Sequence, residues 1–370
     1  MFTRILTLII KEFLTLIRDK KSRFVLIVPP LVQLFVFGYA ATFDLNHVPI
    51  AVYNEDSGVI SRELIANFTA SPAFEQVMTI DHQQQIAPAL DNKKVLAVLH
   101  IDKNFSQQLL EKRLPAKVQI LIDGRNSNTA MIALNYIQTI VADFNKSWAK
   151  NHHMTLPPAQ LKIRSWFNPN LESRWFIIPG IIGLLTLVVT IIVTALSVAR
   201  EREQGTFDQL LVTPFTPFEI LMGKAIPGLI IGLVEASLII FMTIYWFQIP
   251  LVGNLAALYL GLTLFVFAVI GIGLMISSLA VTQQQGLLGA FLFIVPAVIL
   301  SGFATPIANM PEFVQHLTVV NPLRYFLVIV RGIFLEGLPI NVLINQYWPL
   351  AVIGSVTLLC AGWLFRRRMY

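Results

Sequence analysis

One carboxylate lies in the most apolar part of the chain. Glu235, in "GLIIGLVEASLII" (228–240), is the one acidic residue well inside a predicted membrane span. A carboxylate inside a membrane is costly, so a functional role is the first interpretation: Glu235 binds a cationic substrate or accepts a proton. The alternative, slightly favoured, is a protonated side chain that makes a hydrogen bond between two helices. Gln33, towards the outer end of the first apolar run, is a weaker candidate for the same substrate path.

Few other residues have the spacing that catalysis or metal binding requires. Asp81-His82 and His152-His153 lie in polar segments, where neighbouring histidines are usually solvated rather than metal-bound. The signatures GxSxG and HExxH are absent, and so is GxxxxGK[ST], the loop that holds nucleotide phosphates. Cys360 is the single cysteine, which excludes a disulfide framework and a cysteine-rich zinc site. We therefore expect no catalytic residue, no metal and no cofactor in this chain.

The composition is that of a membrane protein. Of the 370 residues, 55% are hydrophobic and only 13% are charged, whereas soluble domains carry about 25% charged residues. A helix needs about 20 apolar residues to cross the hydrocarbon layer. The segments that meet this requirement are 24–43, 175–198, 225–248, 255–280, 286–304 and 348–365. We predict an α-helical polytopic membrane protein with six transmembrane helices.

Charged and aromatic residues predict the orientation of these spans. Lys and Arg gather in residues 1–23, in the segment 199–224 and in the tail 366–370, which six spans place on one side, the cytoplasm. Trp175, Trp246 and Trp348 then all lie at the outer interface. The apolar residues of 1–23 recur at helical spacing opposite Arg4, Lys11 and Arg18, which predicts an amphipathic helix on the inner membrane surface. We interpret 1–43 as this helix plus an uncleaved anchor, rather than as a signal peptide.

A polar stretch, residues 44–174, separates the first two spans and has an ordinary soluble composition. The runs 48–56, 94–102 and 116–124 have the length and residue types of strands, and 128–148 has a helical pattern. Alternating strands and helices predict a small α/β domain, placed outside the cytoplasm by the topology above. We expect it to bind or gate, since no catalytic signature is present.

The segment 199–224, "AREREQGTFDQLLVTPFTPFEILMGK", is a charged hairpin between two spans. Gly205 is expected to end the preceding helix, and Thr206 to cap a short second helix that Pro214 and Pro217 stop. The apolar residues of that short helix, which include Phe207 and Leu210, are expected to be exposed. A turn that only joins two spans needs fewer residues, so the hairpin is a candidate docking site for a partner protein.

The same residues carry a family resemblance. The stretch 197–224, "NPLRYF" (321–326) and the opening 11–34 resemble the signatures of ABC-2 type permeases, the membrane subunits of a class of ABC exporters. The large domain between the first two spans resembles the drug-efflux-like branch of that family. The resemblance implies that Glu203, Gly205, Thr206, Phe207, Asp208, Gln209 and Leu210 form a coupling helix that contacts a separate ATPase.

The resemblance also implies the partners and the outer part of the path. The working unit would be two P-loop ATPase subunits, which bind ATP and Mg, with two permeases that are identical or homologous. A periplasmic adaptor accompanies some relatives. The segment 305–347 is too polar to span and is expected to form a re-entrant or interfacial helix at the outer face, where Asn321, Pro322 and Arg324 lie.

The predicted function is therefore that of an exporter permease in the bacterial inner membrane, with both termini in the cytoplasm. It would move a hydrophobic or amphipathic substrate outward, and would itself hydrolyse nothing. Two alternatives remain: a proton-coupled secondary transporter that uses Glu235, and a membrane sensor that transports nothing. Six spans and the lack of an evident inverted repeat weigh against the first.

Overall fold

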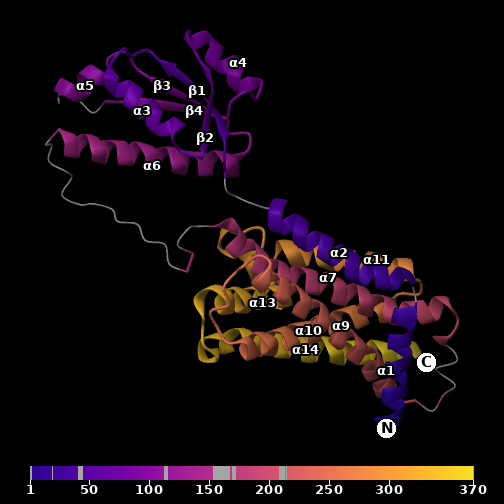
Figure 1. Ribbon diagram of the computed structural model, residues 1–370. Coiled ribbons are helices and arrows are strands. Elements are labelled where there is room, and N and C mark those ends of the chain that lie inside the picture. The colour runs from indigo at the N-terminus through magenta and orange to yellow at the C-terminus, as the bar shows by residue number, and fades with distance from the viewer. Residues whose placement is uncertain are drawn as a thin grey trace. The chain divides into compact units, whose positions relative to one another are not determined.

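The computed structural model describes residues 2–18, 20–40, 45–111, 116–152, 167–168, 172–207, 213 and 215–369. The chain divides into two compact units (Figure 1). One comprises Met1–Thr42 with Ser165–Tyr370 and is helical; the other, Phe43–Arg164, contains the sheet. We describe each unit by itself.

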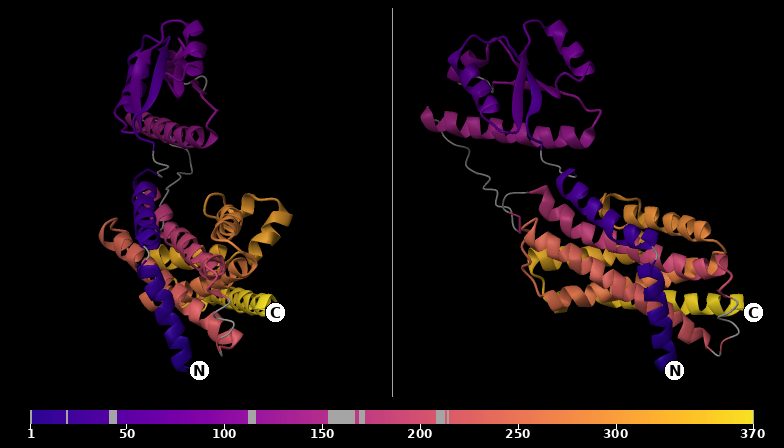
Figure 2. Two further views of the ribbon diagram at one scale, coloured as in Figure 1. Left: turned by 90° about the vertical axis from the view of Figure 1, so that its right-hand side faces the viewer. Right: turned by 45° about the vertical axis from the view of Figure 1, so that its right-hand side comes forward.

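The helical unit holds the apolar helices. Its main helices are α1 (Phe2–Arg18), α2 (Lys20–Ala40), α7 (Ser173–Glu203), α9 (Pro217–Tyr245), α10 (Leu255–Leu279), α11 (Gln283–Ile299) and α14 (Ile340–Met369). Between α11 and α14 lie η2 (Ile307–Asn309), α12 (Glu312–Leu317), η3 (Thr318–Val320), α13 (Pro322–Arg331) and the π-helical turn η4 (Gly332–Glu336). Figure 2 shows α1 running across the direction of the long helices.

Helix α7 is the centre of this unit and packs against α2, α9, α10, α11 and α13. Small residues let its neighbours approach closely. A β-carbon on Gly273 of α10 would lie 1.8 Å from the Thr194 hydroxyl of α7, and one on Gly232 of α9 would lie 2.7 Å from that of Thr190. Close backbone contact through small residues is how helices associate in a membrane.

The described residues include four helices long and apolar enough to cross a membrane, namely α7, α9, α10 and α14. A fifth span results if the bent pair Glu312–Val320 and Pro322–Glu336 is counted as one. The predicted spans 24–43 and 286–304 fall on shorter apolar helices, Ile27–Tyr39 and Gln283–Ile299. At 1.5 Å per residue, the 17 residues of α11 extend about 26 Å, less than the roughly 30 Å of a hydrocarbon core. A helical, membrane-protein-like fold with a small sheet is confirmed, whereas the count of six is not.

The segment after α11 turns sharply. Its two helical parts are bent by 84°. Asn321 caps α13, because its side-chain oxygen accepts a hydrogen bond from the Leu323 N–H (3.1 Å) and Pro322 occupies the first turn. Helix α14 begins at Ile340, before the predicted start at 348, since Gly337 ends η4 in a left-handed conformation (φ 65°) and the chain can start a new helix just after Pro339.

The α/β unit contains a four-stranded sheet in the order β2-β1-β3-β4. The strands are β1 (Val48–Asn54), β2 (Phe74–Thr79), β3 (Ala97–Ile101) and β4 (Val118–Ile122), and only β4 runs antiparallel to its neighbour. The helices are α3 (Val59–Thr69), η1 (Gln83–Gln85), α4 (Ile86–Asp91), α5 (Phe105–Glu111) and α6 (Ser127–Asn151). The alternation of side chains along β1 builds two cores, one under α3 and α6 and one under α4. Strand β2 was not predicted from the sequence, because half of its residues, "FEQVMT", are polar and the polar and apolar residues do not alternate.

Candidate coupling and binding sites

The predicted hairpin begins at the end of α7, which is closed by main-chain hydrogen bonds. The Gly205 N–H donates to the Arg202 carbonyl (3.1 Å) and the Thr206 N–H donates to the Glu201 carbonyl (3.0 Å), with Gly205 at a φ of 69°. This is a Schellman motif, in which a left-handed residue lets the chain leave the helix while its last carbonyls stay bonded. The chain direction after α7 is therefore set by local geometry.

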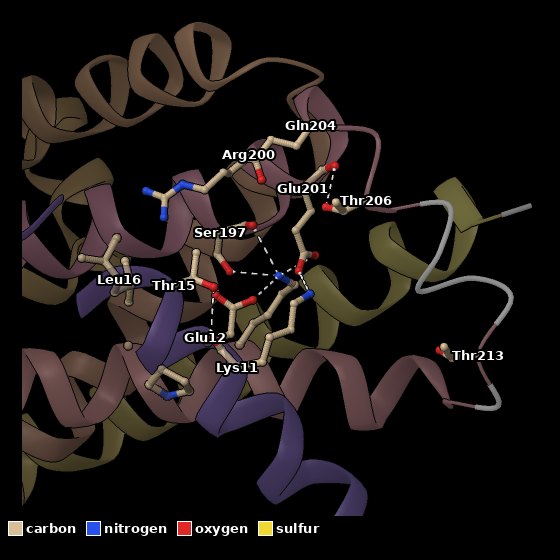
Figure 3. Close-up of a pocket in the computed structure, with 14 residues that line it drawn as sticks. Lys11, Glu12, Thr15, Leu16, Ser197, Arg200, Glu201, Gln204, Thr206 and Thr213 are labelled. Atoms are coloured by element: carbon tan, nitrogen blue, oxygen red, sulfur yellow. Dashed lines mark hydrogen bonds and ion pairs between the residues drawn. The ribbon is translucent and has the colours of Figure 1, made fainter. Parts of the chain in front are cut away.

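A cluster of buried charges lies beside that helix end. Lys224 of α9 lies 2.7 Å from Glu12 of α1 and 2.8 Å from Glu201 of α7. Lys11 of α1 is 2.6 Å from the other oxygen of Glu201, and Lys224 also donates to the side chain and carbonyl of Ser197 (3.2 and 3.3 Å). Figure 3 shows Lys11, Glu12 and Glu201 pointing toward one another from α1 and α7. We call Lys11, Glu12, Glu201 and Lys224 the ion cluster.

The ion cluster connects three helices. Only 4% of the Lys224 side chain and 9% of the Glu201 side chain are exposed, while 44% of Lys11 is. A buried ion is tolerated only when it is paired and hydrogen-bonded, so these groups hold α1, α7 and α9 in one arrangement. They border a polar pocket of about 320 Å³, which also reaches Arg200, Gln204 and Thr206 at the end of α7.

The end of α7 is also attached to α10 and α11. The Arg202 guanidinium donates to the carbonyls of Ser278 and Ala280 (2.9 and 3.2 Å). The Ser277 hydroxyl accepts from the Val198 N–H (2.9 Å), and Glu203 accepts from the Gln283 N–H (2.7 Å). A displacement of this helix end therefore acts on several helices at once.

The predicted coupling residues differ in their surroundings. Glu203, Gly205 and Thr206 close α7 as described, and all three are partly or fully exposed. Phe207, expected to be exposed, is instead only 5% exposed: its ring packs edge-on against Phe365 at 5.9 Å, and Arg202 lies over it at 4.9 Å. Removing this ring from water stabilises the bundle, which explains the difference. Asp208, Gln209 and Leu210 lie outside the described residues.

The residues predicted for the substrate path are separated in the structure. Glu235 is 8% exposed and lines an apolar groove between α1, α2 and α9. Gln33 is exposed on α2 and is not among the residues lining that groove. Arg324, in the outer signature, donates to the Thr318 hydroxyl and lies over the Tyr325 ring at 5.7 Å. Asn321 donates to the Ala297 carbonyl (2.7 Å), which ties the start of α13 to α11.

Metal binding finds no support in the described part of the chain. No group of three His, Cys, Asp or Glu residues there is arranged to hold a metal ion. His152 stacks on the Trp148 ring at 3.5 Å, and His153 lies outside the described residues.

No role was predicted for Glu12 or Glu201, and Lys11 was predicted to lie on the polar face of an amphipathic helix. The one available signal was an acidic residue flanked by lysine in an otherwise basic helix.

The whole length of the chain matches known proteins. Residues 20–365 match the profile of a family described as ABC-2 family transporter protein. The chain belongs to the ABC-2 transporter family. The ABC-2 resemblance read from the sequence is thus confirmed, and with it the classification as a transport subunit that is not itself an enzyme. Permeases of the ABC-2 family work with an ATPase partner.

Individual ABC-2 relatives match over nearly their full length. The chain is 41% identical over 369 residues to the probable multidrug ABC transporter permease YbhR of Escherichia coli (strain K12), covering 100% of both chains. It is 30% identical to the probable multidrug ABC transporter permease YbhS of the same strain, over 99% of this chain and 97% of YbhS. The inner membrane transport permease YhhJ is 29% identical, over 97% and 96% of the two chains. A likeness to YbhR and YbhS was also predicted from the sequence and is confirmed.

Proposed function

We propose that this chain is the permease subunit of an ABC exporter that moves a hydrophobic or amphipathic substrate, drug-like or lipid-like, outward across the inner membrane. The names of YbhR and YbhS, both probable multidrug permeases, support the drug-like class. The observation that carries the proposal is the ion cluster, which joins α1, α7 and α9 at the base of the hairpin 199–224.

In this proposal the hairpin receives the movement of a separate ATPase. Closure of two ATPase subunits on ATP and Mg would push Glu203, Gly205, Thr206 and the residues up to Leu210. Because α7 ends in a closed Schellman motif and is bonded to α10 and α11, the push would reach the bundle as a displacement of whole helices. Lys224 and Glu201 would carry it to α1 and α9.

The proposed topology has six spans, with α2 and α11 crossing the membrane in addition to α7, α9, α10 and α14. Both termini and the hairpin would face the cytoplasm, and the α/β unit would lie outside. The bent segment 305–347 would cap the outer end of the path, as its 84° bend suits a re-entrant element. The complete transporter would contain two permeases and two ATPases, with or without a periplasmic adaptor.

The experiment that tests this proposal is co-purification of the full-length protein from native membranes in mild detergent. The double variant Gly205→Pro with Leu210→Asp disrupts the hairpin, while Leu110→Asp alters a residue that is 62% exposed in the α/β unit. We expect a P-loop ATPase to accompany the wild type and Leu110→Asp but not the hairpin variant. All three proteins must first insert and accumulate equally.

Absence of any ATPase from the wild-type preparation would contradict the exporter proposal. Uptake assays in proteoliposomes would then separate the alternatives. Substrate movement driven by a pH gradient, lost in Glu235→Gln, would identify a secondary transporter, and the absence of any flux would indicate a sensor.

A further inference from the structure

An apolar groove of about 690 Å³ lies between α1, α2 and α9 in the helical unit. Its walls are almost entirely aliphatic and aromatic, from residues such as Phe13, Ile27, Leu31 and Val234. Among the described residues that line it, Glu235 is the one acidic residue, and Ser237 and Arg23 are the other polar ones. A groove of this size accommodates an organic molecule rather than a simple ion.

Neither carboxylate oxygen of Glu235 has a hydrogen-bond partner within the described part of the chain, although both are buried. Ser237, the nearest polar residue along α9, is engaged elsewhere: it donates to the Leu233 carbonyl (2.6 Å) and accepts from the Tyr259 hydroxyl (2.7 Å). The Arg23 side chain is exposed, and none of the described ion pairs includes Arg23. Among the residues that the structure describes, none therefore supplies a counter-ion to this carboxylate.

An uncompensated carboxylate in an apolar groove is expensive, and the low dielectric that makes it so also strengthens its attraction for a cation that enters. The aliphatic walls favour a ligand with an apolar body, because removing apolar surface from water is favourable. The two requirements together select a molecule with a single positive charge and a bulky apolar body. An anion of the same size meets only the second requirement.

We propose that this groove is a binding site for lipophilic cations, such as protonated amines, quaternary ammonium ions and phosphonium ions, with Glu235 as the counter-ion. The inference rests on the proposed exporter function only in treating the bound cation as a substrate. Binding itself requires neither ATP nor a partner, so it is measured on this chain alone.

The test compares two ions of nearly equal size and shape and opposite charge, tetraphenylphosphonium and tetraphenylborate. Equilibrium dialysis measures their binding to the purified full-length protein in detergent, corrected with protein-free micelles. We expect Glu235→Gln to weaken tetraphenylphosphonium binding at least tenfold, and Glu235→Asp to weaken it only a few-fold. Tetraphenylborate binding should not weaken in either variant, and should strengthen in Glu235→Gln, because that substitution removes the repulsion between the carboxylate and the anion. The control Glu336→Gln, which removes an exposed carboxylate from the same unit, should change the binding of neither ion.

A second variant tests the walls independently of the charge. Leu238→Trp fills part of the groove and should weaken tetraphenylphosphonium binding in a protein that keeps Glu235. Should Glu235→Gln not accumulate, wild type must still prefer the phosphonium and Leu238→Trp must still reduce its binding. Equal affinity of wild type and Glu235→Gln for tetraphenylphosphonium, or of wild type for the two ions, overturns the proposal.

Failure of this proposal and failure of the exporter proposal have different signatures. Glu235-dependent binding without an ATPase in the native complex supports the cation site and contradicts the exporter. An ATPase-associated protein whose affinity for tetraphenylphosphonium is independent of Glu235 supports the exporter and overturns the cation site.

Discussion

Lys224 is the residue on which the arrangement at the base of the hairpin most depends. It is the only member of the ion cluster that contacts both carboxylates, Glu12 at 2.7 Å and Glu201 at 2.8 Å. Removing one partner of a buried ion pair leaves the other charge uncompensated, which costs about 3 to 5 kcal/mol. Lys11 is half-exposed, so replacing it is expected to cost less stability than replacing the buried Lys224.

We expect Lys224→Met to lower the free energy of unfolding by about 3 to 5 kcal/mol. The reason is that Glu12 loses its cation and Glu201 keeps only Lys11. The measurement is a denaturant titration of the detergent-purified protein. Lys11→Met is the matched control, with an expected loss of about 1 kcal/mol or less, because water screens this pair and Glu201 keeps Lys224. Equal losses in the two variants would show that burial does not decide the strength of the cluster.

A second charged pair, in the α/β unit, predicts a dependence on pH. The side-chain and main-chain hydrogen bonds from Arg125 lower the pKa of Asp123 from 3.8 to about 2. Arg125 also donates to the carbonyls of Leu90 (2.6 Å) and Asp91 (3.3 Å), so the pair connects the end of α4 with the turn after β4. A carboxyl group whose pKa is lowered in the folded state stabilises that state above about pH 4 and stops doing so as the pH falls towards 2.

We therefore expect residues 86–127 of the full-length protein to become more susceptible to pepsin between pH 4 and pH 2. In Asp123→Asn the cleavage rate should change less over this interval, because residue 123 no longer titrates. Asp143→Asn, which removes an exposed ion pair with Lys146, should behave as the wild type. The same pH dependence in wild type and Asp123→Asn would exclude this carboxylate as the cause.

At the scale of elements, the end of α7 depends on one backbone conformation. Gly205 has a φ of 69°, and a methyl group added there would meet nothing within 4 Å. The cost of replacing it is therefore conformational, about 1 to 2 kcal/mol for a residue with a β-carbon and less for Asn.

We expect Gly205→Ala to speed hydrogen exchange at the Thr206 amide about tenfold, since 1.4 kcal/mol corresponds to a factor of ten. That amide donates to the Glu201 carbonyl and reports directly on the helix end. Gly205→Asn should produce a smaller increase. Gly124→Ala serves as the control, because neither a positive φ nor a nearby atom opposes a methyl group there. Unchanged exchange in Gly205→Ala would contradict the assigned role of the motif.

At the scale of the whole molecule, the proposed topology places the α/β unit and the hairpin on opposite sides of the membrane. We expect Val59→Cys, 72% exposed in the α/β unit, to react with an impermeant maleimide added to spheroplasts. Gln204→Cys, exposed at the end of α7, should react only after the membrane is permeabilised. Both are made in a Cys360→Ser background.

The opposite labelling pattern would invert the topology. Reaction of both cysteines in intact spheroplasts would contradict the proposed topology, in which one span, α7, separates the two positions. Orientation would then have to be reassigned before any direction of transport is considered.

Local chemistry explains which features could be predicted from the sequence. The apolar runs that became α7, α9, α10 and α14 were found because hydropathy depends only on neighbouring residues. The position of Gly205 at the end of α7 was predicted because helix ends use a small set of residue types. Strand β2 was missed, because its polar and apolar residues do not alternate and only its pairing with β1 shows that it is a strand.

Which distant groups meet depends on how the helices pack together. Lys11 and Glu201 are separated by 190 positions, and Lys224 and Glu12 by 212. Their pairing depends on α1 packing against α9, where Leu8 contacts Gly223. From its place in the hairpin, Phe207 was expected to be exposed for docking, yet it is buried against Phe365. Burial, charge compensation and the groove beside Glu235 are properties of several helices together, so no stretch of sequence read alone contains them.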